Sequence, residues 1–345
     1  MIENKRQKMD ENEIRITVEA HPNIALIKYW GKKSETEMTP LNDSISLAID
    51  IFHAKTTLTA RRVEEGEESV DTVSINGREI TLNTRFNRVF KSVRDRLDSS
   101  WSFSISSSTN FPVAAGLASS AAGFAAIAFA LGKAFDLSQT DIERLARYGS
   151  GSASRSGLPG LVQWKKGDEK EESSVLSHFP SSHWPDLRLV ILVVKDEEKS
   201  ISSKEGMERT ARTSELLQDR IRRNPARIQG IIDSFASRDF STLAELTMRD
   251  SNEFHAVCLD SYPPIQYLNT TSWSIINLVH SFNKESVRAA YTFDAGPNAC
   301  IFTLKEYMDE FVSLVHSSFS IGDSIEKELR SVHISTLGDG PKVVE

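Results

Sequence analysis

The chain has 345 residues, of which 39% are hydrophobic and 26% charged. This length suits about two domains, and the composition is that of an ordinary globular protein. The formal net charge of −7 argues against a nucleic-acid-binding surface of the usual basic kind.

The cysteine count and the N-terminal segment both point to an intracellular setting. Two cysteines, Cys258 and Cys300, are too few for a disulfide framework and lie in apolar stretches, so we predict core residues in a reducing compartment. Residues 1–13 are rich in charge and are expected to be disordered. Neither a signal peptide nor a membrane span is recognisable. We therefore expect a cytoplasmic protein with no membrane partner.

The first half is predicted to be rich in strands. Alternating apolar residues indicate strands in IRITVEA, IALIKYW, SISLAID, KTTLTARRV and DTVSINGREITL. Asn76-Gly77 within the last stretch is typical of a hairpin turn. Helical spacing predicts a helix from Phe86 to Leu97, and a strand, WSFSISSS, comes next. A long apolar helix from Leu117 to Phe135 and a second helix, TDIERLARYGSG, complete this half.

A polar connector from Lys165 to Pro185 is predicted to separate the two halves. The next stretch, LRLVILVV, is an unbroken apolar run typical of a buried central strand. We place the domain boundary here, which gives an N-terminal domain of residues 14–186 and a C-terminal domain of residues 187–345.

The second half mixes helices and strands without regular βαβ alternation, so the predicted fold class is α+β. Strands are predicted in VRAAYTF, ACIFTL and VHISTL. The predicted helices are Ser203–Gln218, Pro225–Ala236, Leu243–Val257, Trp273–Phe282 and Glu306–His316.

The stretch NFPVAAGLASSAAG, residues 110–123, consists almost entirely of small side chains and leads into the long apolar helix. Each glycine inside a helix costs about 1 kcal/mol relative to alanine, so helix stability does not explain this composition. Small residues let backbone N–H groups approach phosphate oxygens, and a helix N-terminus adds a partial positive charge. Tight packing of an alanine-rich helix against a sheet is the alternative.

Pro112, Gly116, Leu117 and the run Ser119–Ala121 match the phosphate loop P-x-x-x-G-L-x-S-S-A of the GHMP kinase superfamily. Four further stretches resemble signature blocks of mevalonate diphosphate decarboxylases. They are HPNIALIKYWGKK, GSGSASRS, SNEFHAVCLDSYPPIQYLN and YTFDAGPNA. The resemblance runs from about Ile14 to Pro341. It implies a two-domain GHMP-kinase-like fold with the active site in the cleft between the domains, and a homodimer.

The resemblance also implies an activity. Mevalonate 5-diphosphate and ATP would give isopentenyl diphosphate, ADP, phosphate and carbon dioxide, through 3-phosphorylation and then elimination. The enzyme would be a carboxy-lyase of isoprenoid and sterol precursor synthesis, with ATP as co-substrate and Mg²⁺ as cofactor. We expect no pyridoxal or thiamine cofactor.

Three residues are assigned catalytic roles by the resemblance. Asp294 would accept or orient the proton of the tertiary 3-hydroxyl, whereas from sequence alone a turn cap is equally plausible. Arg155 would orient the carboxylate that leaves as carbon dioxide. Lys28 would favour the ionised form of Asp294.

Lys28 and Lys32 are four residues apart, so in a strand they would share a face and converge on an anion. Solvated surface lysines are the alternative. Ser203 matches a family serine near the diphosphate, although a helix N-cap is equally plausible. His255 is predicted to be a packed helix residue and not a ligand. The residues assigned to substrate binding are Asn23, Tyr29, Lys32, Ser150, Ser152, Arg155 and Ser203.

The nucleotide phosphates are assigned to the small-residue loop and the start of the helix that follows. The hydroxyl of Ser119 or Ser120, together with the ATP phosphates, would hold Mg²⁺, with no dedicated protein site. The residues assigned to ATP are Asn110, Pro112, Ala115, Gly116, Leu117, Ala118, Ser119 and Ser120.

Two departures from the family pattern lie near these residues. Val113 stands where threonine is expected, and Gly157-Leu158-Pro159 replaces a segment that carries an aromatic residue. They leave open a phosphomevalonate decarboxylase that acts on the monophosphate. A non-catalytic ligand-binding module of the same fold is a third possibility, but it would not need to retain Asp294.

Overall fold

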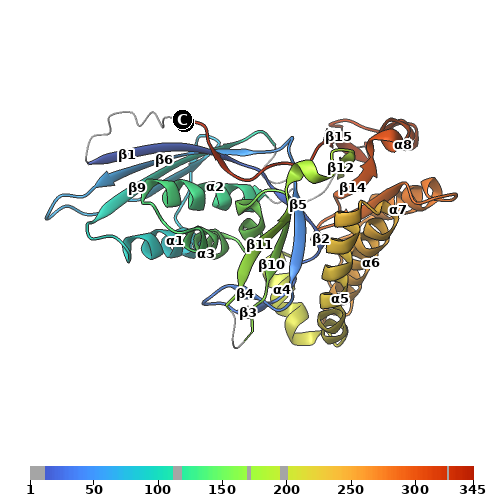
Figure 1. The fold of residues 1–345 in the computed structure, drawn as a ribbon, viewed down its shortest axis with the longest axis horizontal. Coiled ribbons are helices and arrows are strands. Elements are labelled where there is room, and N and C mark those ends of the chain that lie inside the picture. Colours follow the sequence, from blue (N-terminus) through green and yellow to red (C-terminus); the bar gives the residue numbers. More distant parts are fainter. Residues whose placement is uncertain (1–11, 112–118, 169–171, 195–200, 325) are drawn as a thin grey trace.

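A six-stranded sheet forms one end of the molecule in the computed structural model, which describes residues 12–111, 119–168, 172–194, 201–324 and 326–345 (Figure 1). Its order is β16-β1-β6-β9-β7-β8. Every second side chain of β6 and of β9 is buried along most of the strand, so one face covers a core. The strands are β1 (Glu13–Ala20), β6 (Ala54–Arg62), β7 (Thr72–Ile75), β8 (Arg78–Glu79), β9 (Trp101–Thr109) and β16 (Lys342–Val343).

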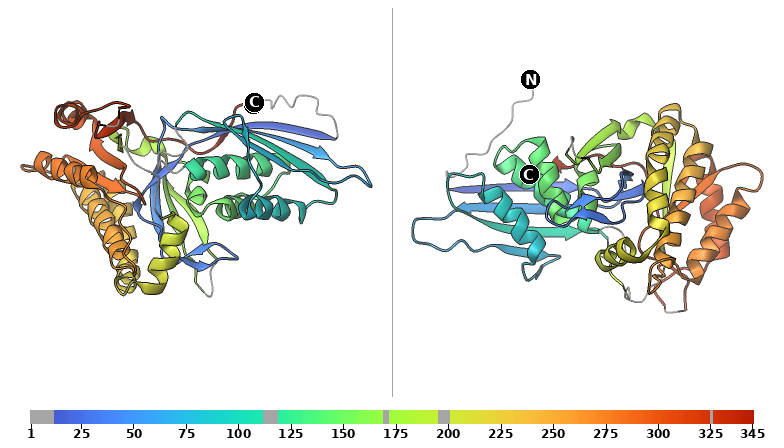
Figure 2. Two further views of the ribbon diagram at one scale, coloured as in Figure 1. Left: turned by 180° about the vertical axis from the view of Figure 1, so that it is seen from behind. Right: turned by 90° about the horizontal axis from the view of Figure 1, so that it is seen from below.

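Three helices cover one face of this sheet: α1 (Thr84–Arg94), α2 (Ser119–Ala134) and α3 (Gln139–Gly149). The alanine-rich α2 lies directly against the sheet, with α1 and α3 on its other side (Figures 1 and 2). Its small side chains permit this close packing, so the packing alternative accounts for much of its composition. The predicted hairpin is confirmed, since Asn76 and Gly77 both have positive φ, 50° and 76°.

A second sheet, ordered β11-β10-β5-β2, stands between the two ends of the molecule. Its strands are β2 (Asn23–Ile27), β5 (Ser44–Ala48), β10 (Leu161–Lys165) and β11 (Ser174–Phe179). The predicted polar connector is therefore wrong, because Lys165–Pro185 contains β11. No side chain of β11 is fully buried, so its sequence lacks the apolar signal of a core strand. Two short strands, β3 (Lys32–Ser34) and β4 (Thr39–Pro40), form a separate hairpin.

The third sheet, β13-β14-β12-β15, is antiparallel throughout. The predicted central strand is confirmed, because β12 is buried and pairs on both sides. The elements of this half are β12 (Leu187–Val194), α4 (Ser203–Thr213), α5 (Leu216–Ser237), α6 (Phe240–Leu259), α7 (Thr270–Phe282), β13 (Ala289–Phe293), β14 (Ala299–Leu304), α8 (Lys305–Ser318) and β15 (Leu329–Ser335).

Two predicted helix boundaries are wrong. The helix predicted over Ser203–Gln218 ends at Thr213, as α4, because Ser214 is extended. Helix α5 then runs through Pro225, where the next helix was predicted to begin. Buried side chains at helical spacing lie on both sides of the proline, including Leu217 and Ile228. Burial of this continuous stripe offsets the one backbone hydrogen bond that proline removes.

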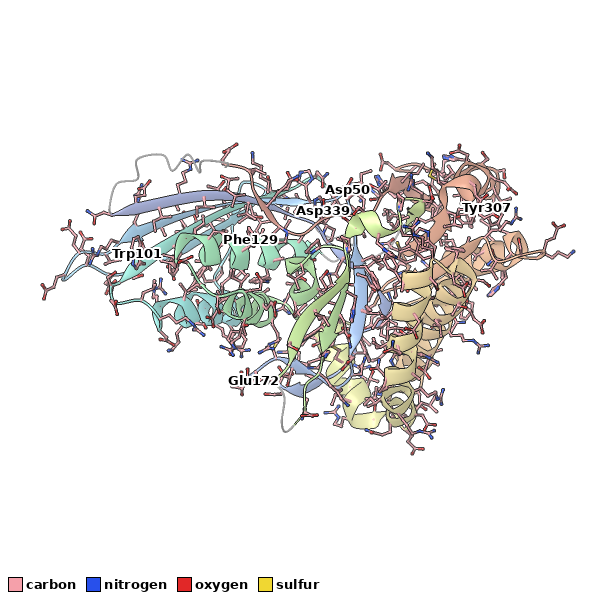
Figure 3. All side chains as sticks on the ribbon, in the orientation of Figure 1. Asp50, Trp101, Phe129, Glu172, Tyr307 and Asp339 are labelled. Carbon is pink, nitrogen blue, oxygen red and sulfur yellow. The ribbon has the colours of Figure 1, made fainter. Side chains whose placement is uncertain are left out.

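The two halves share a core. Leu47 of β5 and Leu161 of β10 belong to the same buried cluster as Leu189 of β12 and Phe235 of α5. The C-terminal segment also crosses back to the first sheet, where Thr17 donates its N–H to the carbonyl of Glu345 (2.9 Å). Figure 3 shows Asp50 and Asp339 close together along this return path. The domain boundary after residue 186 stays a prediction.

At the N-terminus, Glu13 already belongs to β1, whereas residues 1–11 of the predicted disordered extension lie outside the described residues. Within the described ranges, no helix combines the length and the apolar character that a membrane crossing requires.

Candidate active site

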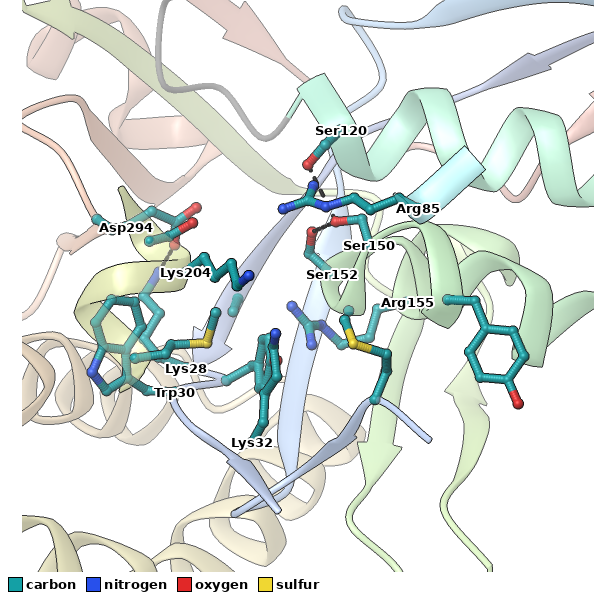
Figure 4. Close-up of a pocket in the computed structure, with 18 of the residues that line it drawn as sticks. Lys28, Trp30, Lys32, Arg85, Ser120, Ser150, Ser152, Arg155, Lys204 and Asp294 are labelled. Carbon is teal, nitrogen blue, oxygen red and sulfur yellow. Dashed lines mark hydrogen bonds and ion pairs between the residues drawn. The ribbon is translucent and has the colours of Figure 1, made fainter. Parts of the chain in front are cut away.

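A cavity of about 670 Å³ lies where the two halves meet. The ends of β2 and β13, the start of α4 and the turn after α3 all border it, and their side chains point into one space (Figure 4). The structure brings together the predicted residues Asn23, Lys28, Tyr29, Lys32, Ser120, Ser150, Ser152, Arg155, Ser203 and Asp294.

Lys28 and Asp294 form an ion pair across the two halves, with Nζ 2.7 Å from Oδ1. Each residue directly follows a buried strand, Lys28 after β2 and Asp294 after β13. The lysine side chain is 3% exposed and the aspartate 38% exposed. The carboxylate therefore faces the cavity while the ammonium stays behind it and holds it through the ion pair.

The predicted sharing of one strand face by Lys28 and Lys32 is wrong. Strand β2 ends at Ile27, and Lys32 opens β3 after Gly31, whose φ is +93°. A side chain on Gly31 would lie 2.6 Å from Leu41 Cδ1, so this turn needs glycine. Lys32 pairs with Glu35 at 2.9 Å, although it still lines the cavity.

Arg155 lies in a 3₁₀ helix of residues 151–157 and is 3% exposed. It donates to the hydroxyls of Ser44 (2.6 Å) and Ser46 (3.2 Å). Burial lowers the pKa of the guanidinium to about 10, although Asp294 acts in the opposite direction, so it stays charged at neutral pH. Among the described residues no carboxylate is within ion-pair distance of Arg155. A buried cation without a counter-ion is costly, so an anionic ligand would stabilise it.

A chain of hydroxyls joins the start of α2 to the turn after α3. Ser120 Oγ lies 3.2 Å from Ser150 Oγ, which lies 3.1 Å from Ser152 Oγ. Gly149 lets the turn approach α2 this closely, because a Cβ at this position would lie 2.0 Å from the ring of Phe124 in α2. Hydroxyls can rotate, so those that bond to one another can also donate to phosphate oxygens.

Two predicted substrate contacts pack around this turn. Asn23 donates to the Ser152 carbonyl (2.9 Å) and to Ser156 Oγ (2.8 Å), so it positions the turn. The buried Tyr29 hydroxyl has no hydrogen-bond partner among the described residues. Burial raises the pKa of Tyr29, so its hydroxyl is a neutral donor at the cavity wall.

Other predicted residues are placed differently. Asn110 lies outside the cavity lining, because its side chain binds the His53 N–H (2.8 Å) and the Ile51 carbonyl (2.7 Å). The Ser202 side chain is the N-cap of α4, and Ser203 is the first residue of that helix. Pro112, Val113, Ala115, Gly116, Leu117, Ala118 and the side chain of Ser119 lie outside the described residues.

Two family models match consecutive parts of the chain. Residues 20–175 match the diphosphomevalonate decarboxylase-like N-terminal domain, and residues 189–344 match the mevalonate 5-diphosphate decarboxylase C-terminal domain. The chain is 42% identical to human diphosphomevalonate decarboxylase over 339 residues, which cover 92% of this chain and 84% of the human protein. This chain belongs to the mevalonate diphosphate decarboxylase family. The family predicted from the sequence is thus confirmed.

Solved structures of this family confirm the two-domain GHMP-kinase-like α+β fold. The mevalonate diphosphate decarboxylase of Staphylococcus aureus matches with a TM-score of 0.86 at 32% identity, over 97% of this chain and 99% of that one. The Trypanosoma brucei enzyme matches with a TM-score of 0.84 at 32% identity, over 96% and 98%. A complex of MDDEF with MVAPP, AMPPCP and magnesium matches with a TM-score of 0.84 at 31% identity, over 96% and 99%.

Several cations of this decarboxylase-family cavity were not predicted from the sequence. Arg85 and Arg88 of α1 and Lys204 of α4 line it, and Figure 4 shows Arg85 and Lys204 pointing inward. With the three cations predicted beforehand, the lining holds six basic residues, against two acidic ones, Glu35 and Asp294. The cavity is therefore positive although the chain carries −7. Two arginines on one helix and a lysine on a helix far away in the sequence form no recognisable motif, so no local signal could have found them.

His255 and both cysteines behave as predicted. His255 is buried against the rings of Phe254 and Phe293, and burial lowers its pKa to about 3, with Lys28 acting in the same direction. Cys258 and Cys300 are free and buried. In the described part of the chain, no group of three or more His, Cys, Asp or Glu side chains could hold a metal ion.

Proposed function

We propose that this chain catalyses the ATP-dependent decarboxylation of mevalonate 5-diphosphate to isopentenyl diphosphate, ADP, phosphate and carbon dioxide. The observation that carries the proposal is the Lys28–Asp294 pair, which opens into the same positive cavity as Arg155, a buried cation with no ion-pair partner among the described residues. A carboxylate, a diphosphate and a triphosphate are all anions, and this cavity offers cations and hydroxyls to each of them. The family relationship favours the same chemistry.

In the first stage the 3-hydroxyl oxygen of the substrate attacks the γ-phosphorus of ATP. A P–O bond forms, the bond to ADP breaks, and Asp294 accepts or orients the hydroxyl proton. Lys28 holds the carboxylate in place through its 2.7 Å contact. Ser120 and the N-terminus of α2 are the groups we assign to the nucleotide phosphates, through hydroxyl and backbone donors.

In the second stage the bond between the tertiary carbon and the ester oxygen breaks, and the phosphate group leaves with the bonding electrons, so positive charge develops on that carbon. The electrons of the bond to the carboxylate then form the double bond, and carbon dioxide departs. Arg155 orients that carboxylate through its planar guanidinium, and Ser150, Ser152, Tyr29, Lys32 and Ser203 are assigned to the diphosphate. No organic cofactor enters this chemistry.

The residues of the cavity fit a magnesium ion that arrives with the nucleotide. Its oxygen donors would be the Ser120 hydroxyl and the phosphates, and Mg²⁺ commonly takes few protein ligands beside phosphate oxygens. The bound ion would neutralise charge that develops on the transferred phosphoryl group. A homodimer, a cytoplasmic location and a role in sterol synthesis are further proposals that the family resemblance supports.

A phosphomevalonate decarboxylase is the second candidate, because Val113 and the segment Gly157-Leu158-Pro159 depart from the family pattern close to the residues assigned to ligands. A direct comparison separates the candidates. Purified protein with Mg-ATP receives either mevalonate 5-diphosphate or mevalonate 5-phosphate, and ADP and carbon dioxide are followed together. Equal amounts of both products from the diphosphate alone support the proposal, and preference for the monophosphate supports the second candidate. ADP without carbon dioxide would indicate a 3-kinase, and neither product would indicate a non-catalytic module.

A further inference from the structure

The backbone of Lys28 is held by charged side chains from the other half of the protein. Its N–H donates to Asp250 Oδ2 of α6 (2.8 Å), and its carbonyl accepts from Arg220 Nη2 of α5 (3.1 Å). Asn42 donates to the same carbonyl (2.9 Å). Because Lys28 follows the last residue of β2, strand pairing does not bind these groups, and helices α5 and α6 supply their partners.

Arg220 and Asp250 also bind each other. Nη1 donates to Oδ1 (2.9 Å) and Nη2 to Oδ2 (3.0 Å), which makes a two-pronged pair. Their side chains are only 1% and 2% exposed. Helices α5 and α6 lie beside β2 (Figure 1).

A buried pair of this kind is weak evidence for a stabilising role. A buried ion pair loses so much hydration that well-packed apolar residues often serve as well or better. A neutral side chain could also satisfy the Lys28 peptide. The pair adds orientation. A planar guanidinium and a carboxylate joined by two parallel hydrogen bonds hold each other in one geometry, which fixes the directions in which Nη2 and Oδ2 meet the Lys28 peptide.

We propose that Arg220 and Asp250 are positioning residues that set the Lys28 ammonium against Asp294. The inference rests on the proposed function, since it assigns a task to residues that do not line the cavity. The N–H and carbonyl of Lys28 bind Asp250 and Arg220, and its Nζ donates to Asp294. A shift of the peptide moves the ammonium, and displacement of a catalytic group by about 1 Å can cost about 100-fold in rate.

The test is a double variant, Arg220→Met with Asp250→Leu, which removes both charges of the pair together. Glu253, which also contacts Arg220, keeps Arg223 and Arg227 as ion-pair partners. We expect an unfolding temperature close to wild type and a kcat lower by roughly 10- to 100-fold. The KM values of both substrates should change by less than about threefold, because the substrate contacts remain. Arg220→Lys should retain intermediate activity, since one ammonium can pair with Asp250 but lacks the fork that also reaches Lys28.

Arg227→Met is the matched control. Arg227 lies 3.3 Å from Asp250 Oδ1 in the same cluster, but no hydrogen bond joins it to the Lys28 backbone among the described contacts. We expect its kcat to stay near wild type. An equal loss in this control, or an unchanged kcat in the folded double variant, would overturn the inference. If the double variant does not fold, Arg220→Lys against Arg227→Met decides the question in the same way.

A crystal structure of the double variant gives a readout that does not need activity. We expect the Lys28 Nζ to Asp294 Oδ1 contact to lengthen or to split between conformers. Retention of the 2.7 Å contact would count against positioning. If the wild-type chain itself forms no product, the proposed function fails alone, and this structure still decides whether the pair positions Lys28.

Discussion

At the scale of single residues, Asp294 is the side chain on which the proposed chemistry depends most. Asp294→Asn keeps the size and removes the negative charge, so the group can no longer take up the 3-hydroxyl proton. We expect turnover to fall by about 10³-fold or more, while nucleotide affinity changes little. Initial rates of ADP and carbon dioxide release, with nucleotide binding measured by calorimetry, check this. Near-normal turnover would remove Asp294 from the mechanism.

His255 should make stability depend on pH. Its folded pKa of about 3 lies below the ordinary histidine value of 6.5 because burial disfavours the charged ring. The unfolded chain therefore binds a proton that the folded chain does not, and stability present above pH 6.5 is lost as pH falls toward 3. This single group predicts a loss of about 2 kcal/mol between pH 7 and pH 5.

Urea denaturation of wild type and His255→Gln at both pH values measures this effect. Glutamine does not titrate, so the variant should lose about 2 kcal/mol less between pH 7 and pH 5 than wild type does. Parallel losses in the two proteins would show that other groups control the acid response.

At the scale of elements, the 3₁₀ helix of residues 151–157 offers a matched pair of glycines. A Cβ on Gly151 would lie 2.9 Å from Tyr29 and 3.1 Å from Trp164, whereas a Cβ on Gly157 meets nothing within 4 Å. We expect Gly151→Ala to lower the free energy of unfolding by roughly 1–3 kcal/mol. It should also raise the substrate KM, because Tyr29 and the turn after α3 must separate. Gly157→Ala should leave both nearly unchanged. Thermal unfolding and steady-state kinetics compare them, and equal effects would refute the steric reasoning.

Elements were predictable where burial leaves a local pattern in the sequence, and unpredictable where it leaves none or where a local rule points the other way. The alternation in β6 and β9 and the apolar run of β12 have local signatures. β11 has none, and α5 continues through Pro225 because tertiary burial outweighs a local rule. The residues of the site also differ in whether the sequence could indicate them. Motif resemblance indicated Asp294, but Arg220 and Asp250 lie 192 and 222 residues from Lys28 in the sequence, and only the fold brings them to it.

At the scale of the whole molecule, the active-site cavity is formed by two halves that a common core joins. Leu47 and Leu161 from the first half share a buried cluster with Leu189 and Phe235 from the second. The ion pair between Lys28 and Asp294 and the return of the C-terminus to β1 add further connections. Neither half can unfold without exposing apolar surface of the other.

We therefore expect one cooperative unfolding transition for the full chain. Differential scanning calorimetry should give a calorimetric enthalpy equal to the van't Hoff enthalpy, the test of two-state behaviour. Mevalonate 5-diphosphate with a non-hydrolysable ATP analogue should raise the temperature of the whole transition, because ligands that bind only the folded state stabilise it by mass action. Two separate transitions, of which the ligands shift only one, would show that the halves unfold independently and that the shared core does not couple them.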